Sequence, residues 1–214
     1  VVPWRVTPLE EGVRVVHLVA GPAREPAARL LRHLPAFTAA LTAFVRAQGR
    51  GYDALHAHYW LSGQVGAALR RRWGVPLVVS FHTLAEVKRL ARHGEREPVA
   101  RSRVERQVQQ QADRIEALTE HERDLLGWLY DVPPERVAVV PAGVDLGLFR
   151  PLDRTDCRLH LGLGEEHVLL YVGRIEPLKG VDVLLRAAAV IEATRPLRVL
   201  IVGGDGQQDP WVGH

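Results

Sequence analysis

Two cationic side chains stand where an apolar run gives way to a helical pattern. Residues 168–172 are predicted to form a buried strand and residues 181–193 a helix. Arg174 and Lys179 lie in the loop between them. A helix N-terminus offers unpaired backbone N–H groups and the positive end of a dipole, while arginine adds a fork of donors and lysine a compact charge. This combination predicts a diphosphate-binding site, and a surface salt bridge to Glu176 is the structural alternative.

The usual phosphate-binding loops are absent from the sequence. Neither G-x-x-x-x-G-K-[ST] nor a G-x-G-x-x-G that follows a predicted strand occurs. The sequence therefore lacks the signatures of P-loop nucleotide triphosphatases and of dinucleotide-dependent dehydrogenases. The loop is therefore expected to hold phosphate charge without a Walker motif.

Glycine, histidine and hydroxyl residues follow the other apolar runs. Ligands bind beyond the carboxyl ends of the strands in an open α/β sheet, so these residues are candidates for a site. They are Gly21-Pro22, His58-Tyr59-Trp60, His82-Thr83, Thr119-Glu120, Pro141-Ala142-Gly143, Gly173-Arg174 and Gly203-Gly204. Some have a structural alternative, because His56 and His58 could be half-buried strand residues and Thr119 could be a helix cap.

The elements that must position these residues alternate along the chain. Strands are predicted over 13–19, 53–59, 77–81, 115–118, 137–140, 168–172 and 198–202. Helices are predicted over 27–47, from a cap at Ser62 to about Trp73, and over 97–112, 120–130 and 181–193. This alternation predicts an α/β fold with parallel sheets. Residues 148–152 resemble a linker, so two incomplete Rossmann-like domains are expected, 1–150 and 151–214.

The composition is that of a globular protein. The chain has 214 residues, of which 47% are apolar and 25% charged, and no apolar stretch approaches a membrane span. A single cysteine, Cys157, and a start unlike a signal peptide suggest a cytoplasmic location. The absence of methionine and the abrupt end at 211–214 suggest a fragment cut at both ends.

The charge balance is basic, with a formal net charge of +3 and an isoelectric point of about 9.4. Such a balance is compatible with nucleic acid, a membrane surface or an anionic small molecule. The densest cluster, Arg70-Arg71-Arg72, ends a predicted helix, where the dipole favours cations. No aromatic residues interleave with it, so a nucleic-acid partner is not expected.

Four segments carry a family resemblance. VGRIEPLKGVDVLL resembles the donor-binding segment of retaining GT-B glycosyltransferases of family 4, and RVAVVPAGVDLGLF is similar to the segment that leads into their second domain. HAHYWLSGQVG and GVPLVVSFHTLAEVK resemble the branch that holds inositol-phosphate glycosyltransferases of mycothiol synthesis, with sucrose-phosphate synthases as close relatives. The resemblance covers nearly the whole chain, from about residue 12 to residue 206.

The resemblance implies a UDP-sugar donor. Gly173, Arg174 and Lys179 would then bind its diphosphate, and Arg174 and Lys179 would also stabilise the charge on the leaving group. His82 would face the reacting sugar. These cations would replace a metal, so neither a metal nor another cofactor is expected. The resemblance also implies retention of configuration by same-face attack, with a donor phosphate oxygen taking the acceptor proton.

On the acceptor side, Tyr59, Thr83 and Arg101 would contact a phosphate group. The branch has a lysine for this phosphate where the alignment here places Ala27, and Arg24 or Arg29 could substitute. The glycine-rich loop that precedes Val1 in the family is absent, as is the later pair of glutamates that binds the donor ribose and sugar.

The leading hypothesis is a retaining transferase that moves GlcNAc or glucose to a phosphorylated polyol or sugar, with inositol 3-phosphate favoured. Sucrose-phosphate-synthase-like and polysaccharide or lipid acceptors remain alternatives, and a homodimer is left open. A second hypothesis is a truncated, non-catalytic binding module, and the chain by itself is expected to be inactive. A third is an α/β epimerase acting on UDP-sugars, although the strand ends carry few of the acidic residues it would need.

Overall fold

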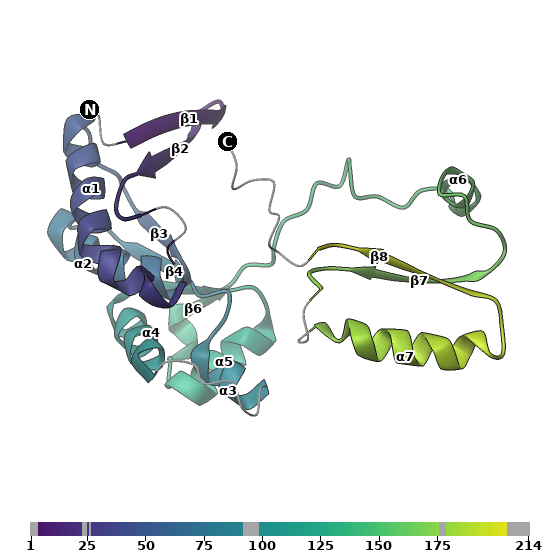
Figure 1. The fold of residues 1–214 in the computed structure, drawn as a ribbon. Helices are drawn as coiled ribbons and strands as arrows, with labels where there is room; N and C mark the ends of the chain where they lie inside the picture. Colours follow the sequence, from purple (N-terminus) through teal and green to yellow (C-terminus); the bar gives the residue numbers. More distant parts are fainter. Residues whose placement is uncertain (1–3, 23–24, 26, 92–98, 176–178, 205–214) are drawn as a thin grey trace. The chain divides into compact units, whose positions relative to one another are not determined.

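A computed structural model describes residues 4–22, 25, 27–91, 99–175 and 179–204. The chain divides into two compact units, Val1–Gly143 and Val144–His214. Each unit has its own parallel sheet and its own helices (Figure 1). No helix in the described part of the chain has the length and apolar character needed to span a membrane.

The first unit is built on a four-stranded parallel sheet. Its strands, in spatial order, are β3 (Leu55–His58), β4 (Leu77–Ser80), β5 (Arg114–Ala117) and β6 (Val137–Val139). The helices of this unit are η1 (Ala27–His33), α1 (Leu34–Ala47), α2 (Tyr59–Trp73), α3 (Ala85–Ala91), α4 (Val99–Gln111), α5 (Glu120–Tyr130) and η2 (Pro134–Arg136). The alternation predicted from the sequence is therefore confirmed for this sheet.

Helix α2 lies unusually close to the sheet and to α4. A Cβ added at Gly63 would lie 2.7 Å from a methyl carbon of Val108, and one at Gly66 would lie 2.8 Å from a methyl carbon of Leu77. Glycine at these two positions lets the helix backbone approach its neighbours. The interior beneath it is apolar and tightly buried, with Val79 and Ile115 at 0% exposure.

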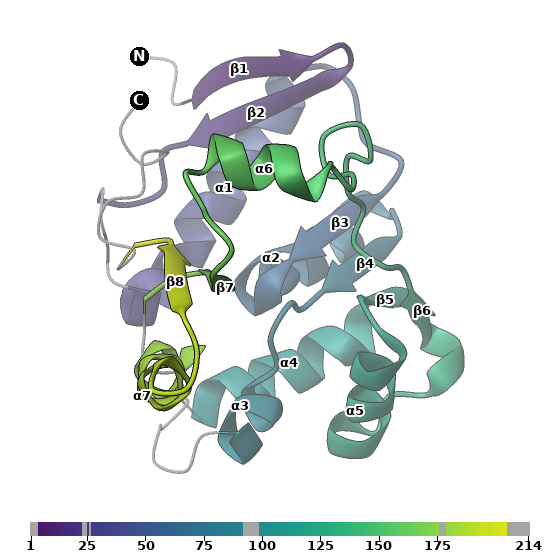
Figure 2. The same cartoon turned by 90° about the vertical axis from the view of Figure 1, so that its right-hand side faces the viewer.

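An antiparallel hairpin precedes this sheet. Strand β2 (Val13–Leu18) was expected to belong to the parallel alternation, but it pairs with β1 (Trp4–Glu10), which the sequence analysis missed. The hairpin lies against α1, where the Trp4 and Phe44 rings meet edge to face at 5.6 Å between centroids (Figure 2). The miss has a physical cause, since β1 is exposed along nearly its whole length and lacks the pattern of a half-buried strand.

Two predicted helices begin differently from expectation. The helix expected over 27–47 is a 3₁₀ segment followed by α1, because Pro35 in the first turn of α1 has no N–H with which to continue a preceding helix. Helix α2 begins at Tyr59, so the prediction that Ser62 is its N-cap is wrong. The prediction for Thr119 is confirmed, because its side chain accepts a hydrogen bond from the Glu122 N–H at the start of α5.

The second unit is a β-α-β unit with one additional helix. Strands β7 (His167–Val172) and β8 (Leu197–Val202) run parallel and are connected through α7 (Val181–Glu192). Helix α6 (Arg154–His160) precedes them and was not predicted. The two strands and α7 match the predicted ranges to within about a residue at each end.

Candidate functional site

The carboxyl ends of β3 and β4 carry unusual backbone geometry. Tyr59, directly after β3, has a φ of +74°, and His82, two residues after β4, has a φ of +58°. Positive φ costs energy in residues with a side chain and is concentrated at functional sites. In the described part of the chain, the only other such non-glycine residue is Asp131, which ends α5.

Three of the residues predicted to bind the acceptor meet at these strand ends. Nη2 of Arg101, on α4, donates to the backbone oxygen of Thr83 at 2.7 Å and to its Oγ1 at 3.0 Å. The guanidinium carbon of Arg101 lies 5.1 Å from the centroid of the Tyr59 ring, within the range of a cation–π contact. Arg101 is 2% exposed, whereas Thr83 is exposed. The arrangement thus joins the hydroxyl of an exposed threonine to a buried cation.

His82 joins this group through a second histidine. Its Nε2 lies 2.9 Å from Nδ1 of His58, and the two rings stack at 5.1 Å between centroids. Partial desolvation lowers the pKa of His58, and the positive charges that His56 and His82 can carry lower it further. His58 is therefore neutral at neutral pH, with one ring nitrogen to donate and one to accept.

The face of the sheet that carries these histidines is polar. His56 Nε2 lies 2.7 Å from Ser80 Oγ and 3.0 Å from a carboxylate oxygen of Glu116. The alternative that His56 and His58 are half-buried strand residues is wrong, because both are exposed. Successive residues of β3 face opposite sides of the sheet, and Ala57, which lies between the two histidines, faces α2. The period-two spacing of the histidines could have indicated this polar face.

Glycines shape the predicted donor-binding loop in the second unit. Gly173 and Gly203 have φ values of +156° and +147°, and a Cβ added at Gly203 would lie 1.8 Å from the Gly173 carbonyl oxygen. The Gly173 N–H donates to Val202 O at 2.9 Å, and the Ile175 N–H donates to Gly204 O at 2.8 Å. Only glycine permits this contact between the loops that follow β7 and β8.

Arg174 lies two residues after the end of β7, and Lys179 lies two residues before the start of α7. The Tyr171 hydroxyl donates to the Arg174 backbone oxygen at 2.6 Å, while the Arg174 side chain is exposed. Lys179, also exposed, directly precedes Gly180, the left-handed residue at the N-cap of α7. Cations beside a helix N-terminus form a site suited to phosphate groups.

Three features of the sequence analysis lie outside the described residues. They are Glu176, the alternative partner in a salt bridge, Arg24, and the side chain of Ala27. Arg29 is described and is exposed in η1.

Comparison with solved structures gives the class of protein. A sucrose-phosphate synthase from Thermosynechococcus elongatus is 30% identical, with a TM-score of 0.82 over 95% of this chain and 50% of that one. Anabaena HepE in complex with UDP-glucose shares the fold at 20% identity, with a TM-score of 0.62 over 86% of this chain and 47% of that one. The chain has the GT-B fold of glycosyltransferases.

The family follows from the sequence matches. The model of the glycosyl transferase 4-like domain matches residues 3–143, and that of glycosyl transferases group 1 matches residues 155–211. The chain belongs to the glycosyl transferase 4-like family.

The curated relatives are named for one reaction. D-inositol 3-phosphate glycosyltransferase from Actinosynnema mirum is 51% identical over 209 residues, covering 93% of this chain and 50% of the relative. The enzyme of the same name from a Nocardioides species is 50% identical over 212 residues, covering 93% of this chain and 46% of the relative. The chain spans about half the length of these relatives.

Proposed function

We propose that the full-length protein carrying this chain is a retaining glycosyltransferase that moves GlcNAc or glucose from UDP to inositol 3-phosphate. The convergence of Tyr59, Thr83 and Arg101 at the strand ends carries the proposal, because it pairs the hydroxyl of an exposed threonine with a cation. The relatives' name, D-inositol 3-phosphate glycosyltransferase, supports the choice of acceptor.

In this proposal, the loop after β7 serves the donor. Arg174, Lys179 and the first N–H groups of α7 bind the diphosphate. As the bond from the sugar to the diphosphate breaks, negative charge grows on the leaving group and these fixed cations stabilise it. The cations supply the charge that a metal ion would otherwise provide, so the transfer proceeds without a metal.

On the acceptor side, the Thr83 hydroxyl donates to the phosphate of the acceptor, and Arg101 adds positive charge from behind. His82, held by neutral His58, lines the position of the reacting sugar. The acceptor hydroxyl attacks the face that the diphosphate leaves, and its proton passes to a donor phosphate oxygen. The new glycosidic bond then has the configuration of the old one, as in a retaining transferase.

The test is UDP release by the purified full-length protein. UDP-GlcNAc and UDP-glucose are each supplied with inositol 3-phosphate, with fructose 6-phosphate, or with buffer alone, in the presence and absence of EDTA. The proposal expects release with inositol 3-phosphate, unchanged by EDTA, and an α-linked product by NMR. Release with fructose 6-phosphate alone would favour the second candidate, a sucrose-phosphate-synthase-like enzyme, which the 30% identical structure supports. Release with neither acceptor would overturn the assignment of a phosphorylated acceptor.

A further inference from the structure

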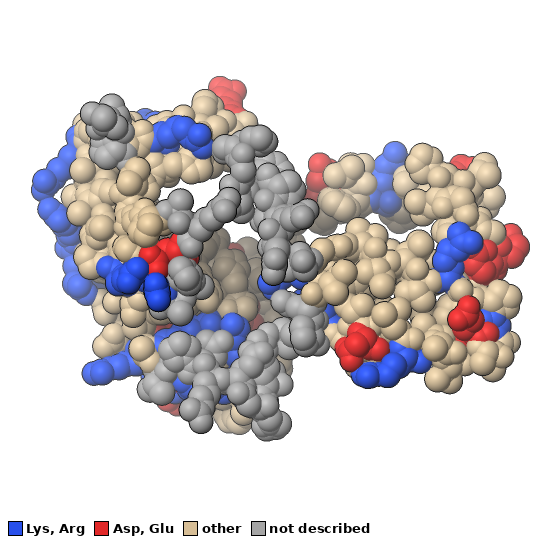
Figure 3. Space-filling model, viewed as in Figure 1, with Lys and Arg blue, Asp and Glu red and all other residues tan. Residues whose placement is uncertain are grey.

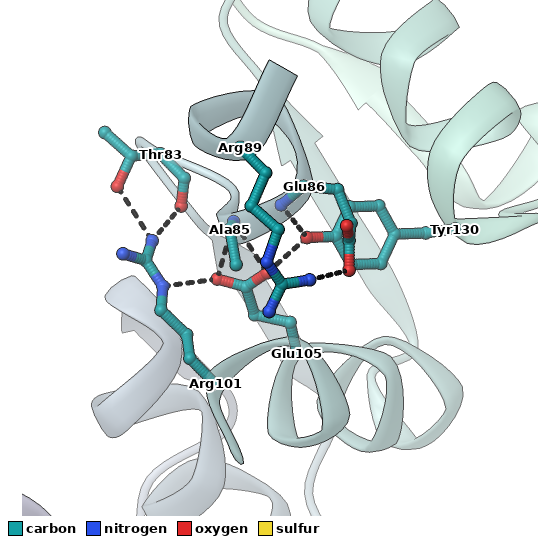
Figure 4. A network of polar contacts seen from close by, with 7 residues as sticks. All are labelled: Thr83, Ala85, Glu86, Arg89, Arg101, Glu105 and Tyr130. Atoms are coloured by element: carbon teal, nitrogen blue, oxygen red, sulfur yellow. Dashed lines mark hydrogen bonds and ion pairs between the residues drawn. The ribbon is translucent and has the colours of Figure 1, made fainter. Parts of the chain in front are cut away.

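A fully buried carboxylate lies behind the acceptor cluster. Glu105, on α4, has 0% exposure and accepts hydrogen bonds from three directions (Figure 4). Nε of Arg101 donates to it at 2.7 Å, the Ala85 N–H donates at 3.0 Å, and the Tyr130 hydroxyl also donates. These donors come from α4, from the start of α3 and from the end of α5. The carboxylate therefore joins three helices at one point.

The contact with Glu105 determines which way Arg101 points. Nε of the guanidinium donates to Glu105, while Nη2, the terminal nitrogen beside it, donates to Thr83. The spacing of four residues along α4 keeps Arg101 and Glu105 on the same face of the helix. Since a guanidinium is planar and rigid, fixing one edge fixes the direction of the others. Glu105 thus turns the terminal nitrogens of Arg101 toward the strand ends.

Tyr130 supports the carboxylate from the opposite side. Its hydroxyl donates to Glu105 and accepts from the Glu86 N–H at 3.1 Å. Burial raises the pKa of Tyr130 well above its usual range, and the hydrogen bond to Glu105 raises it further, so the hydroxyl stays protonated. Beyond it, Arg89 pairs with the Glu86 carboxylate at 2.7 Å (Figure 4). With three donors in place, the buried Glu105 carboxylate has its hydrogen bonds satisfied in the interior.

We propose that Glu105, supported by Tyr130, is a positioning residue that aims Arg101 and thereby sets the preference for a phosphorylated acceptor. The proposal rests on the proposed function, because it requires Arg101 to act on the acceptor phosphate. Glu105 itself does not touch the acceptor. Its effect is transmitted through the guanidinium and Thr83.

The experiment compares Glu105→Gln and Tyr130→Phe with the unchanged full-length protein. Steady-state kinetics are measured with inositol 3-phosphate and with unphosphorylated inositol. Glu105→Gln is expected to lower kcat/KM for inositol 3-phosphate by about 10- to 100-fold, the usual worth of a hydrogen bond to a charged group. The kcat/KM for unphosphorylated inositol and the KM for the UDP-sugar are expected to change little. Tyr130→Phe is expected to act in the same direction by a smaller factor.

Glu122→Gln is the matched control. Glu122 also accepts a backbone hydrogen bond, from Leu118 at 2.8 Å, but it lies on α5 outside the contacts described for Arg101. This variant is expected to leave the preference for the phosphorylated acceptor unchanged. An equal loss on both acceptors in Glu105→Gln would indicate a merely structural role and overturn the proposal. If Glu105→Gln does not fold, an unchanged preference in Tyr130→Phe would overturn it.

Arg101→Lys, alone and combined with Glu105→Gln, separates the two proposals. If Arg101→Lys leaves the preference unchanged, the role of Arg101 in the proposed function fails. If Arg101→Lys reduces the preference and Glu105→Gln does not, only the positioning role of Glu105 fails. If Glu105 acts through Arg101, the double variant shows no greater loss of preference than Arg101→Lys alone.

Discussion

Arg174 combines a fixed backbone with an exposed side chain. Its carbonyl oxygen accepts from the Tyr171 hydroxyl, and the Ile175 N–H that follows is bound to Gly204. This support fixes where the side chain begins, whereas the exposed guanidinium keeps its rotamer freedom until a ligand binds. Backbone ordering therefore adds little to the cost of a contact between Arg174 and a developing charge.

Replacement of Arg174 by alanine in the full-length protein is expected to lower kcat by about 10²- to 10³-fold, the usual effect of losing one such stabilising group. The KM of the acceptor should change little, because the lost interaction strengthens as the leaving group gains charge. Steady-state kinetics measure both constants. Arg186→Ala is a suitable control, since Arg186 is an exposed α7 residue paired with Asp182 at 2.6 Å. A normal kcat in Arg174→Ala would refute the role in leaving-group stabilisation.

Asp113 connects three elements of the first unit. Nε and Nη2 of Arg70, in the last turn of α2, donate to its two oxygens at 2.6 and 2.5 Å. The Leu77 N–H at the start of β4 donates to Oδ2 at 2.8 Å, and Asp113 immediately precedes β5. The hydrogen bonds from Arg70, with a further one from Leu77, lower the pKa of Asp113 to about 2.

This lowered pKa predicts a defined pH dependence of stability. An unfolded aspartate titrates near ~3.9, so the contribution of Asp113 is complete above that pH and disappears as the pH falls toward 2. Asp113→Asn is expected to lower Tm at pH 7 by about 2–4 °C. The difference in Tm between Asp113→Asn and the unchanged protein should shrink below pH 4. Thermal unfolding followed by circular dichroism at pH 7, 4 and 2.5 measures it, and a difference independent of pH would contradict the ion pair as its source.

Elements with strong local patterns could be predicted from the sequence. Strands β4, β7 and β8 are largely apolar runs, and α5 begins with a capping threonine. Helix α3 has only seven residues, and its first N–H groups are bound by Glu105 and Tyr130 from other helices. Such long-range contacts leave no periodic signal in the sequence, which is why α3 was missed.

The candidate site, like the fold, could be predicted only in part from the sequence. The residue types of Tyr59, Thr83 and Arg101 could be identified from a family resemblance, but their mutual contact depends on the packing of α4 beside the strand ends. Glu105 was overlooked although it stands four residues after Arg101, a spacing that favours an ion pair on a helix. Glu105 is fully buried beside Arg101, and this burial can be seen only in the folded chain.

The two units differ in how much apolar surface they bury. The first has a continuous core in which Leu77, Val79 and Ile115 are fully buried. In the described part of the second, the buried apolar side chains are Val181 and Ala188, while Leu170, on β7, is 62% exposed. Uncharged surface covers much of the visible face of that unit, and its charged side chains stand in mixed groups (Figure 3).

This difference predicts unequal stability within the chain. Amide hydrogens of β7 and β8 are expected to exchange at least ~10-fold faster than those of β4 and β5, since local opening costs least where few apolar contacts are buried. Hydrogen exchange of the 214-residue chain, followed by mass spectrometry of peptides from each sheet, measures this ratio. The peptide that contains α5 serves as an internal reference, because Leu126 within it is fully buried. Equal protection in both sheets would mean that the chain opens as one cooperative body, and that the apolar side chains of β7 and β8 are covered in solution.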